Sequence, residues 1–224
     1  MDQNIKIAVL GGGGRTGKYL VSYLLSKGYH LKILLRNIPE TDTVLTDEFS
    51  LTLNNPRVEI VKGDAVVYKD IQKLLSGCQA VISTIGQRPD EPMVASTATE
   101  HVLRVMQEFD IQRYILVAGV NVDTPFDNKS EKTRAATNWM KQNFPAIHDD
   151  RAKAYDLLVK NQLDWTLVRL PMIEYTGENF PTDSNTKDCL GQQISTADIA
   201  FFLEEQLTDK KYIRKAPFLY NLKH

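Results

Sequence analysis

Seven residues near the start of the chain, 11–17, have the sequence GGGGRTG and lie between a short apolar run and a stretch of helical periodicity. Gly11, Gly14 and Gly17 have the G-x-x-G-x-x-G spacing, and Gly12 and Gly13 add the tighter G-x-G-x-x-G pattern. Bare amide groups at a helix N-terminus attract anions, whereas side chains there would block the approach of a diphosphate. We therefore expect this segment to bind the pyrophosphate of a dinucleotide; the alternative is a flexible turn without a ligand.

An arginine stands about 20 residues after these glycines, at the end of the next apolar run. In such a fold the residue at this place meets the adenosine ribose, where an acid binds a free 2′-hydroxyl and a base binds a 2′-phosphate. The residue is Arg36, and Arg15 offers a second forked donor for the same phosphate. The pattern predicts NADP(H) rather than NAD(H), unless Arg36 lies on a solvated strand tip without effect on cofactor choice.

These residues must be positioned by strands, and short β-rich runs indeed alternate with stretches of helical period. The runs are apolar on successive residues, which is typical of strands covered by helices on both faces. The alternation predicts an α/β fold of the Rossmann type, a doubly wound parallel sheet in a single domain, with strand order 3-2-1-4-5-6. The six expected strands lie at 5–10, 31–35, 58–61, 80–85, 114–118 and 165–168, with a short seventh near 217–221.

Helix signals occupy the intervals between these runs. Gly28 is placed to end the first helix in a left-handed conformation, and Ser195 with Asp198 resembles a capping box that opens the last one. The segments 39–55 and 174–188 have weak periodicity and are expected to be loops or short helices. Helices are expected around 20–25, 71–75, 93–109, 131–142, 149–160 and 195–207.

Composition excludes several classes of protein. The 224 residues, 42% of them hydrophobic, suffice for one domain over 1–224, and a net charge of −1 provides no field that would attract nucleic acid. The sequence contains no run of about 18 apolar residues, so we expect no membrane span. Two cysteines, too far apart for a metal site or a disulfide framework, favour a reducing cytoplasm.

Several segments together make the chain resemble the atypical short-chain dehydrogenases of the NmrA-like, flavin reductase and biliverdin reductase type. The resemblance implies that Asp64 accepts a hydrogen bond from the adenine amine and that Lys153 holds the nicotinamide ribose; Asp64 could instead cap the following helix. The marks of the resemblance are the glycine segment and residues 36–37, 61–64, 83–86, 113–117, 152–153, 163–169 and 194–200. The residues expected to contact the cofactor are Gly11, Gly13, Gly14, Arg15, Thr16, Gly17, Arg36, Asn37, Asp64, Ala65, Thr84, Ile85, Gly86, Ala118 and Lys153.

Typical catalytic members of that group carry a serine and a Tyr-x-x-x-Lys helix, and this chain departs from the pattern. It keeps Lys153, but Asp149 stands at the tyrosine position and Ala118 begins the segment that usually holds the serine. Chemistry that needs a tyrosinate base is therefore disfavoured. Hydride donation to quinones, flavins or conjugated tetrapyrroles needs little help with protonation and stays open.

Three candidate catalytic residues, Lys153, His148 and Asp149, lie close together in the sequence. His148 could donate a proton near neutral pH or be a loop histidine without a role, and Asp149 with Lys153 could be a surface pair at i, i+4. Met172 and Tyr175 follow the sixth strand and could form a substrate wall, although core packing would equally explain an apolar residue such as Met172. The substrate-side segments are expected around 86–92, 119–150 and 171–194.

Three functions fit these features. The first is an NADPH-dependent reductase that transfers hydride to a flat, conjugated small-molecule acceptor. The second is a non-catalytic NADP(H) sensor that reports redox state to a protein partner. The third, an epimerase or dehydratase for nucleotide sugars, fits the fold but not Asp149 at the tyrosine position.

Overall fold

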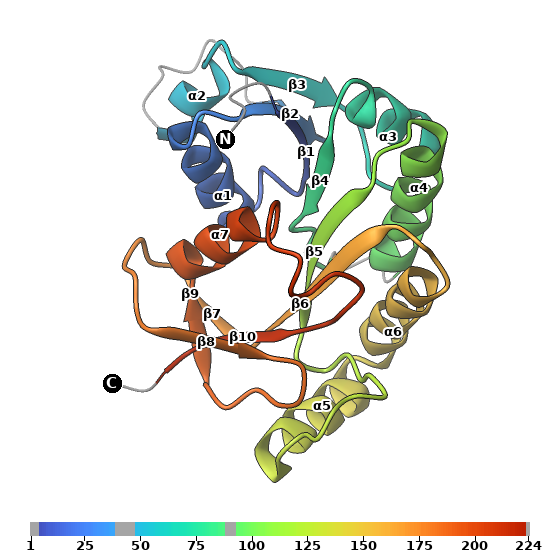
Figure 1. The fold of residues 1–224 in the computed structure, drawn as a ribbon, viewed down its shortest axis with the longest axis vertical. Helices are drawn as coiled ribbons and strands as arrows, with labels where there is room; N and C mark the ends of the chain where they lie inside the picture. The colour runs from blue at the N-terminus through green and yellow to red at the C-terminus, as the bar shows by residue number, and fades with distance from the viewer. Residues whose placement is uncertain (1–4, 39–47, 88–92, 223–224) are drawn as a thin grey trace.

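The computed structural model describes residues 5–38, 48–87 and 93–222, and a mostly parallel sheet runs through them (Figure 1). Its strand order is β3-β2-β1-β4-β5-β6-β10-β8, which confirms the predicted order and the predicted seventh strand. β10 is parallel to β6, and β8 is antiparallel to β10. The strands are β1 (Lys6–Leu10), β2 (His30–Leu35), β3 (Val58–Lys62), β4 (Ala80–Ser83), β5 (Arg113–Gly119), β6 (Asp164–Leu170), β8 (Thr182–Asn185) and β10 (Phe218–Asn221).

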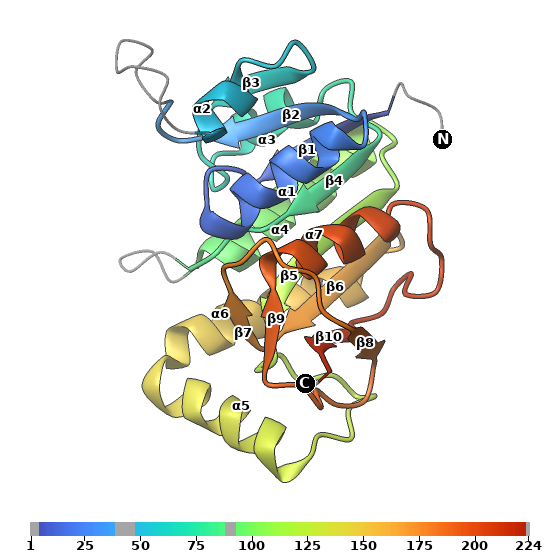
Figure 2. The same ribbon diagram turned by 90° about the vertical axis from the view of Figure 1, so that its left-hand side faces the viewer.

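Helices cover both faces of the sheet, as expected for a doubly wound fold. α1, α2 and α7 lie on one face and α3, α4 and α6 on the other, while α5 extends beyond α6 at one end (Figures 1 and 2). No helix in the described part of the chain is both long and apolar enough to cross a membrane. The helices are α1 (Arg15–Ser26), α2 (Glu48–Leu53), α3 (Tyr68–Leu75), α4 (Val94–Glu108), α5 (Glu131–Asn143), α6 (Pro145–Val159) and α7 (Thr196–Glu205).

The structure contains both predicted helix ends: the left-handed glycine after α1 and the capping box that opens α7. Gly28 has φ +91°, which is the left-handed conformation, and its N–H donates to the Leu25 carbonyl at 2.9 Å. The Ser195 hydroxyl oxygen accepts from the Asp198 N–H at 3.0 Å, so the first turn of α7 is capped by a side chain. These two short-range signals depend only on neighbours in the sequence, which is why they can be predicted without the fold.

The weakly periodic segment 174–188 holds a strand that the sequence did not predict. β8 is polar (TDSN) and partly exposed, and it forms a strand because it pairs with the buried β10. β7 (Met172–Glu174) and β9 (Gln193–Ser195) form a separate parallel pair. α6 begins at Pro145, four residues before the expected start. In the other weak segment, α2 lies within 48–55, and 39–47 falls outside the described residues.

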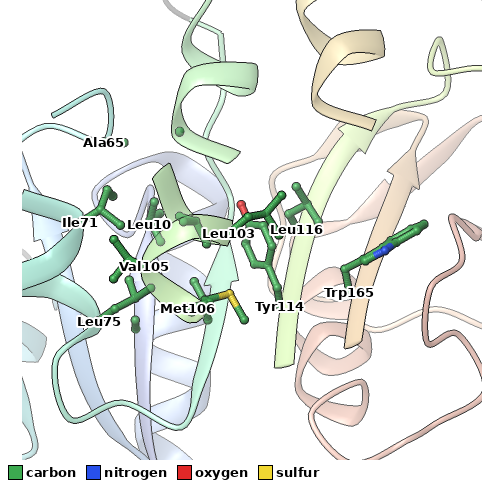
Figure 3. Close-up of a cluster of buried hydrophobic side chains, with 14 of the residues drawn as sticks. Leu10, Ala65, Ile71, Leu75, Leu103, Val105, Met106, Tyr114, Leu116 and Trp165 are labelled. Carbon is green, nitrogen blue, oxygen red and sulfur yellow. The ribbon is translucent and has the colours of Figure 1, made fainter. Parts of the chain in front are cut away.

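Two hydrophobic clusters hold the layers together, one on each face of the sheet. Successive residues of β1 alternate between them, with Ile7 in one and Leu10 in the other. Figure 3 shows the cluster beneath α4, where Leu103 and Met106 meet side chains of the strands. Each such side chain contributes about 1.5–3 kcal/mol when fully buried. The alternation explains why the strands are apolar at successive positions.

Candidate functional site

The glycine segment forms a tight turn between β1 and α1. Gly11 has φ +79°, and its carbonyl accepts from the Gly14 N–H at 3.0 Å. A Cβ on Gly17 would lie 2.0 Å from the Gly11 carbonyl oxygen, so the helix can approach the strand this closely only with glycine there. Gly14 is the N-cap of α1 and the first turn holds no acid, which leaves the helix N-terminus suited to an anion.

A groove of about 410 Å³ opens on this turn, and we call it the nucleotide groove. The register of β1 against β4 places Gly11 beside Thr84, whose hydroxyl lies 3.3 Å from the carbonyl oxygens of Leu10 and Gly11. The groove fits a dinucleotide, because five of its lining residues are glycines, which leave the backbone open to a diphosphate, and Arg36 is among the others. Nine predicted cofactor residues line it: Gly11, Gly13, Gly14, Arg36, Asn37, Ala65, Thr84, Ile85 and Gly86.

Asp64 does not line the nucleotide groove. Its carboxylate accepts from the Val66 N–H at 3.1 Å, and its own N–H donates to Asp70 at 3.0 Å. The N-cap of α3 is Val67, so the alternative in which Asp64 caps that helix is wrong. The turn that Asp64 makes instead holds the following residue, Ala65, in the groove wall.

A smaller pocket of about 280 Å³ continues the groove across the ends of β4, β5 and β6, and we call it the central pocket. It shares Gly14 and Gly86 with the nucleotide groove and adds Thr16 and Ala118 from the predicted set. Ala118 and Gly119 occupy the segment that holds a serine in typical catalytic members of the group. They give the pocket an apolar wall instead. Gly17 is buried behind the turn and lines neither space.

Beyond the central pocket lies a larger cavity of about 880 Å³, here called the distal cavity. The register of β5 against β6 puts Gly119 beside Leu170, and the chain segments that leave these two strands form the cavity with α5 and the start of α6. Met172 and Tyr175, which we expected to contact a substrate, line this cavity, and Met172 is 76% exposed, so core packing does not explain that side chain. Ile173 lines the cavity and also packs on the core.

The structure does not bring Arg15 to Arg36, contrary to the expectation of two donors for one phosphate. Arg15, in the first turn of α1, lines the central pocket and the distal cavity, whereas Arg36 lines the nucleotide groove. Its guanidinium lies 3.9 Å from the centre of the Tyr175 ring, a cation–π contact. Arg15 therefore belongs to the boundary between the central pocket and the distal cavity.

Lys153 is also placed differently from the prediction. It is exposed and lines none of the three spaces, whereas Arg151, two residues earlier, lines both the central pocket and the distal cavity. Residues two apart on a helix point in nearly opposite directions. The buried stripe of α6 includes Ala154 and Leu158, and its spacing places Arg151 on the inner side. That spacing is a signal from which Arg151 could have been found.

Arg151 is held by two carbonyl groups at the ends of different strands. Its Nη2 donates to the Ile85 carbonyl at 2.9 Å, and its Nη1 donates to the Val117 carbonyl at 3.4 Å. Burial lowers the pKa of the Arg151 guanidinium, while the charge of Asp150 opposes this shift. The side chain is thus a fixed cation at the bottom of the site.

The two neighbouring acids on α6 differ in role. Asp149, the predicted catalytic residue, is exposed and lines none of the three spaces. Asp150 is buried, and its carboxylate oxygens accept from the N–H groups of Ala95 and Ser96 at 2.8 and 2.9 Å. Asp150 therefore caps the N-terminus of α4 from another helix, a contact that the sequence does not reveal.

His148 remains a prediction as a proton donor. The ring is partly buried, and its Nδ1 lies 3.4 Å from the side-chain nitrogen of Asn121. Asn121 lines the distal cavity and His148 does not. Asn121 thus lies between the histidine and the space in which a substrate would lie.

A buried charge network supports the loop behind the distal cavity. Arg169 is fully buried, and its Nη1 lies 2.8 Å from Asp127. Lys129 donates to the Val120 carbonyl at 2.8 Å and lies 3.7 Å from the same aspartate. The Arg169 guanidinium also lies 3.6 Å from the centre of the Phe218 ring. The network connects β6 and β10 to the segment that follows β5.

Comparisons with known proteins agree with this geometry. A family model described as NAD(P)H-binding matches residues 11–210. A short-chain dehydrogenase/reductase of Veillonella parvula in complex with NADP superimposes with a TM-score of 0.78 at 16% identity, over 97% of this chain and 94% of that one. A candidate NADH-flavin reductase of Streptococcus pneumoniae gives a TM-score of 0.72 at 22% identity, over 98% and 100%.

Among sequence relatives, cinnamoyl-CoA reductase 1 of Petunia hybrida is 24% identical over 192 residues, which are 76% of this chain and 56% of that protein. The chain spans about half the length of the curated relatives that it matches.

Proposed function

The chain belongs to the NAD(P)H-binding family, and on that premise we propose that it is an NADPH-dependent reductase of a flat, conjugated acceptor bound in the distal cavity. The observation that carries the proposal is the continuity of the three spaces from the glycine turn to the distal cavity, through shared lining residues. The resemblance to a candidate NADH-flavin reductase supports the same type of acceptor.

The preference for NADPH is supported by the end of the nucleotide groove. Arg36 and Asn37 line it there, and the part of the groove wall that the described residues form contains no aspartate or glutamate. An acid at this place would bind a free ribose hydroxyl, whereas a guanidinium matches a phosphate with paired donors. We expect Arg36 to meet the 2′-phosphate.

Other residues would bind the diphosphate, shape the central pocket and supply the proton. The N-terminus of α1 holds the diphosphate, and Thr84 is fixed by the carbonyls at the end of β1. A bound reduced nicotinamide would supply the hydride. Ala118 and Gly119 give the central pocket an apolar wall at the end of β5, and the proton comes from solvent or from His148.

The test is stopped-flow oxidation of NADPH against quinones, free flavins and dichlorophenol-indophenol. We expect turnover with at least one class of acceptor above the background measured without protein. Absence of turnover with every acceptor would reject the reductase.

A specific observation also favours a second function, a non-catalytic NADP(H) sensor. Ala118 replaces the serine, and Asp149 at the tyrosine position is exposed outside the three spaces. Tight binding of cofactor without turnover, together with a protein partner retained by only one redox form, would support the sensor. Turnover with a physiological acceptor at a useful rate would reject it.

A further inference from the structure

Three basic side chains, those of Arg15, Lys132 and Arg151, line the distal cavity. Among the described residues that form its wall there is no aspartate or glutamate. The rest of its wall is mostly apolar, with Trp139 and Met172 among the larger side chains. A mainly apolar cavity with a few convergent polar groups is typical of a site for a small molecule, and the sign of the charge selects an anion.

Arg151 is the cation that shows this most clearly. Its two hydrogen bonds go to neutral carbonyl oxygens, and within the described part of the chain it forms no ion pair. A guanidinium has five N–H donors, so donors remain for a ligand. The adjoining carboxylate, Asp150, is occupied by the backbone N–H groups of α4. A partly buried cation of this kind is stabilised when an anion enters.

Lys132 and Arg15 differ from Arg151 in their position and in their contacts within the cavity. Lys132 lies in the first turn of α5, so it reaches the cavity from a different helix than Arg151. Arg15 is already stacked on Tyr175. Lys132 and Arg151 are therefore the two lining cations of the cavity that are not stacked on one of its aromatic rings.

We propose that the distal cavity selects acceptors that carry a carboxylate or phosphate on a flat ring system, with Arg151 as the main contact and Lys132 as the second. This inference rests on the proposed reductase function, because the ring is the group that would accept hydride. The apolar wall contacts the ring, and the cations fix its orientation relative to the central pocket.

The first experiment compares FMN with riboflavin as acceptors for NADPH, since the two share one ring system and differ by a phosphate. We expect kcat/KM for FMN to exceed that for riboflavin by roughly 10- to 100-fold, the factor typical of a charge-assisted hydrogen bond. Arg151→Met should reduce this ratio most, and Lys132→Met less. The matched control is Lys141→Met, which removes an exposed lysine of α5 outside the cavity and should leave the ratio unchanged.

The second experiment needs no turnover and separates this inference from the reductase. Calorimetry measures the binding of 2-naphthoate and of its neutral analogue 2-naphthamide to the protein saturated with NADP⁺. Tighter binding of the naphthoate, lost in Arg151→Met and kept in Lys141→Met, supports the anion site even if no acceptor is reduced. Equal affinity for the two compounds, no binding of either, or a preference unaffected by Arg151→Met would overturn it.

Discussion

The nucleotide groove and the distal cavity are built by opposite means. The groove takes its wall from backbone turns at the ends of β1, β2 and β4, and its geometry depends on glycines in one segment of seven residues. The cavity depends on side chains brought from distant parts of the chain: Arg151 is held by carbonyls 34 and 66 residues away, and Arg169 binds Asp127 across 42 residues. Two halves of one site can therefore fail for different reasons.

A site made from backbone is sensitive to added atoms, because a new Cβ meets main chain that cannot move aside. A region held by buried charges is sensitive to the loss of a partner, since the charge left behind stays out of water. Four pairs of variants test whether this difference is real, and the largest effect is expected in the charge network.

Asp127→Ala removes the carboxylate shared by Arg169 and Lys129, both of which are buried. We expect a loss of about 3–5 kcal/mol in the free energy of unfolding, measured by urea denaturation, because the fully buried Arg169 loses its carboxylate partner and Lys129 loses one of its two. Asp123→Ala is the matched control: its side chain is 64% exposed although it also contacts Lys129, so its cost should stay below about 1 kcal/mol. Similar costs for the two variants would refute the difference between the two halves.

Arg36→Ala tests the nucleotide groove by its ligand. Loss of a charge-assisted bond to the 2′-phosphate should weaken NADPH binding by about 1.5–3 kcal/mol while NADH binding changes little. Fluorescence titration with both nucleotides measures this. Lys62→Ala, at the exposed end of β3 and outside the groove, controls for the general loss of a positive charge. Equal weakening of NADPH and NADH would remove Arg36 from the phosphate site.

Gly17→Ala tests whether the glycine turn that supports the groove tolerates an added atom. The new Cβ would lie 2.0 Å from the Gly11 carbonyl oxygen, so we expect a cost of about 1–3 kcal/mol in the stability of the protein without cofactor. Gly86→Ala serves as the control, because no heavy atom lies within 4 Å of its added Cβ. Thermal unfolding of both variants decides the point, and an unaltered melting temperature for Gly17→Ala would contradict the close contact between Gly17 and the Gly11 carbonyl.

Asp150→Ala and Asp149→Ala compare neighbouring acids on α6. Asp150 caps α4 through two N–H groups, so its loss should cost about 0.5–2 kcal/mol. Asp149 is exposed, and its replacement should change stability by less than about 0.5 kcal/mol. Urea denaturation gives both values. A larger effect at Asp149 would show that the helix is rotated from the orientation described.

Much of the nucleotide half could be predicted from the sequence. Gly11, Gly14 and Gly17 indicate a turn at which side chains would block close approach, and Arg36 follows at the end of a strand whose apolar pattern is clear. The central six strands and their order were likewise predictable, because buried parallel strands are apolar at successive positions. In each case the signal lies within a few residues of the structure that it specifies.

The other half was decided by the tertiary structure. The spacing of α6 could indicate Arg151, but the strand-end carbonyls that hold it come from segments 34 and 66 residues away, and finding Asp150 as a cap required two helices to be brought together. β8 became a strand only by pairing with β10. Charge pairs and caps between distant segments leave no periodic trace, because their energy comes from burial and proximity in space. The sequence by itself therefore determined the sheet and the turn that suits a diphosphate, while packing decided which charges face the distal cavity.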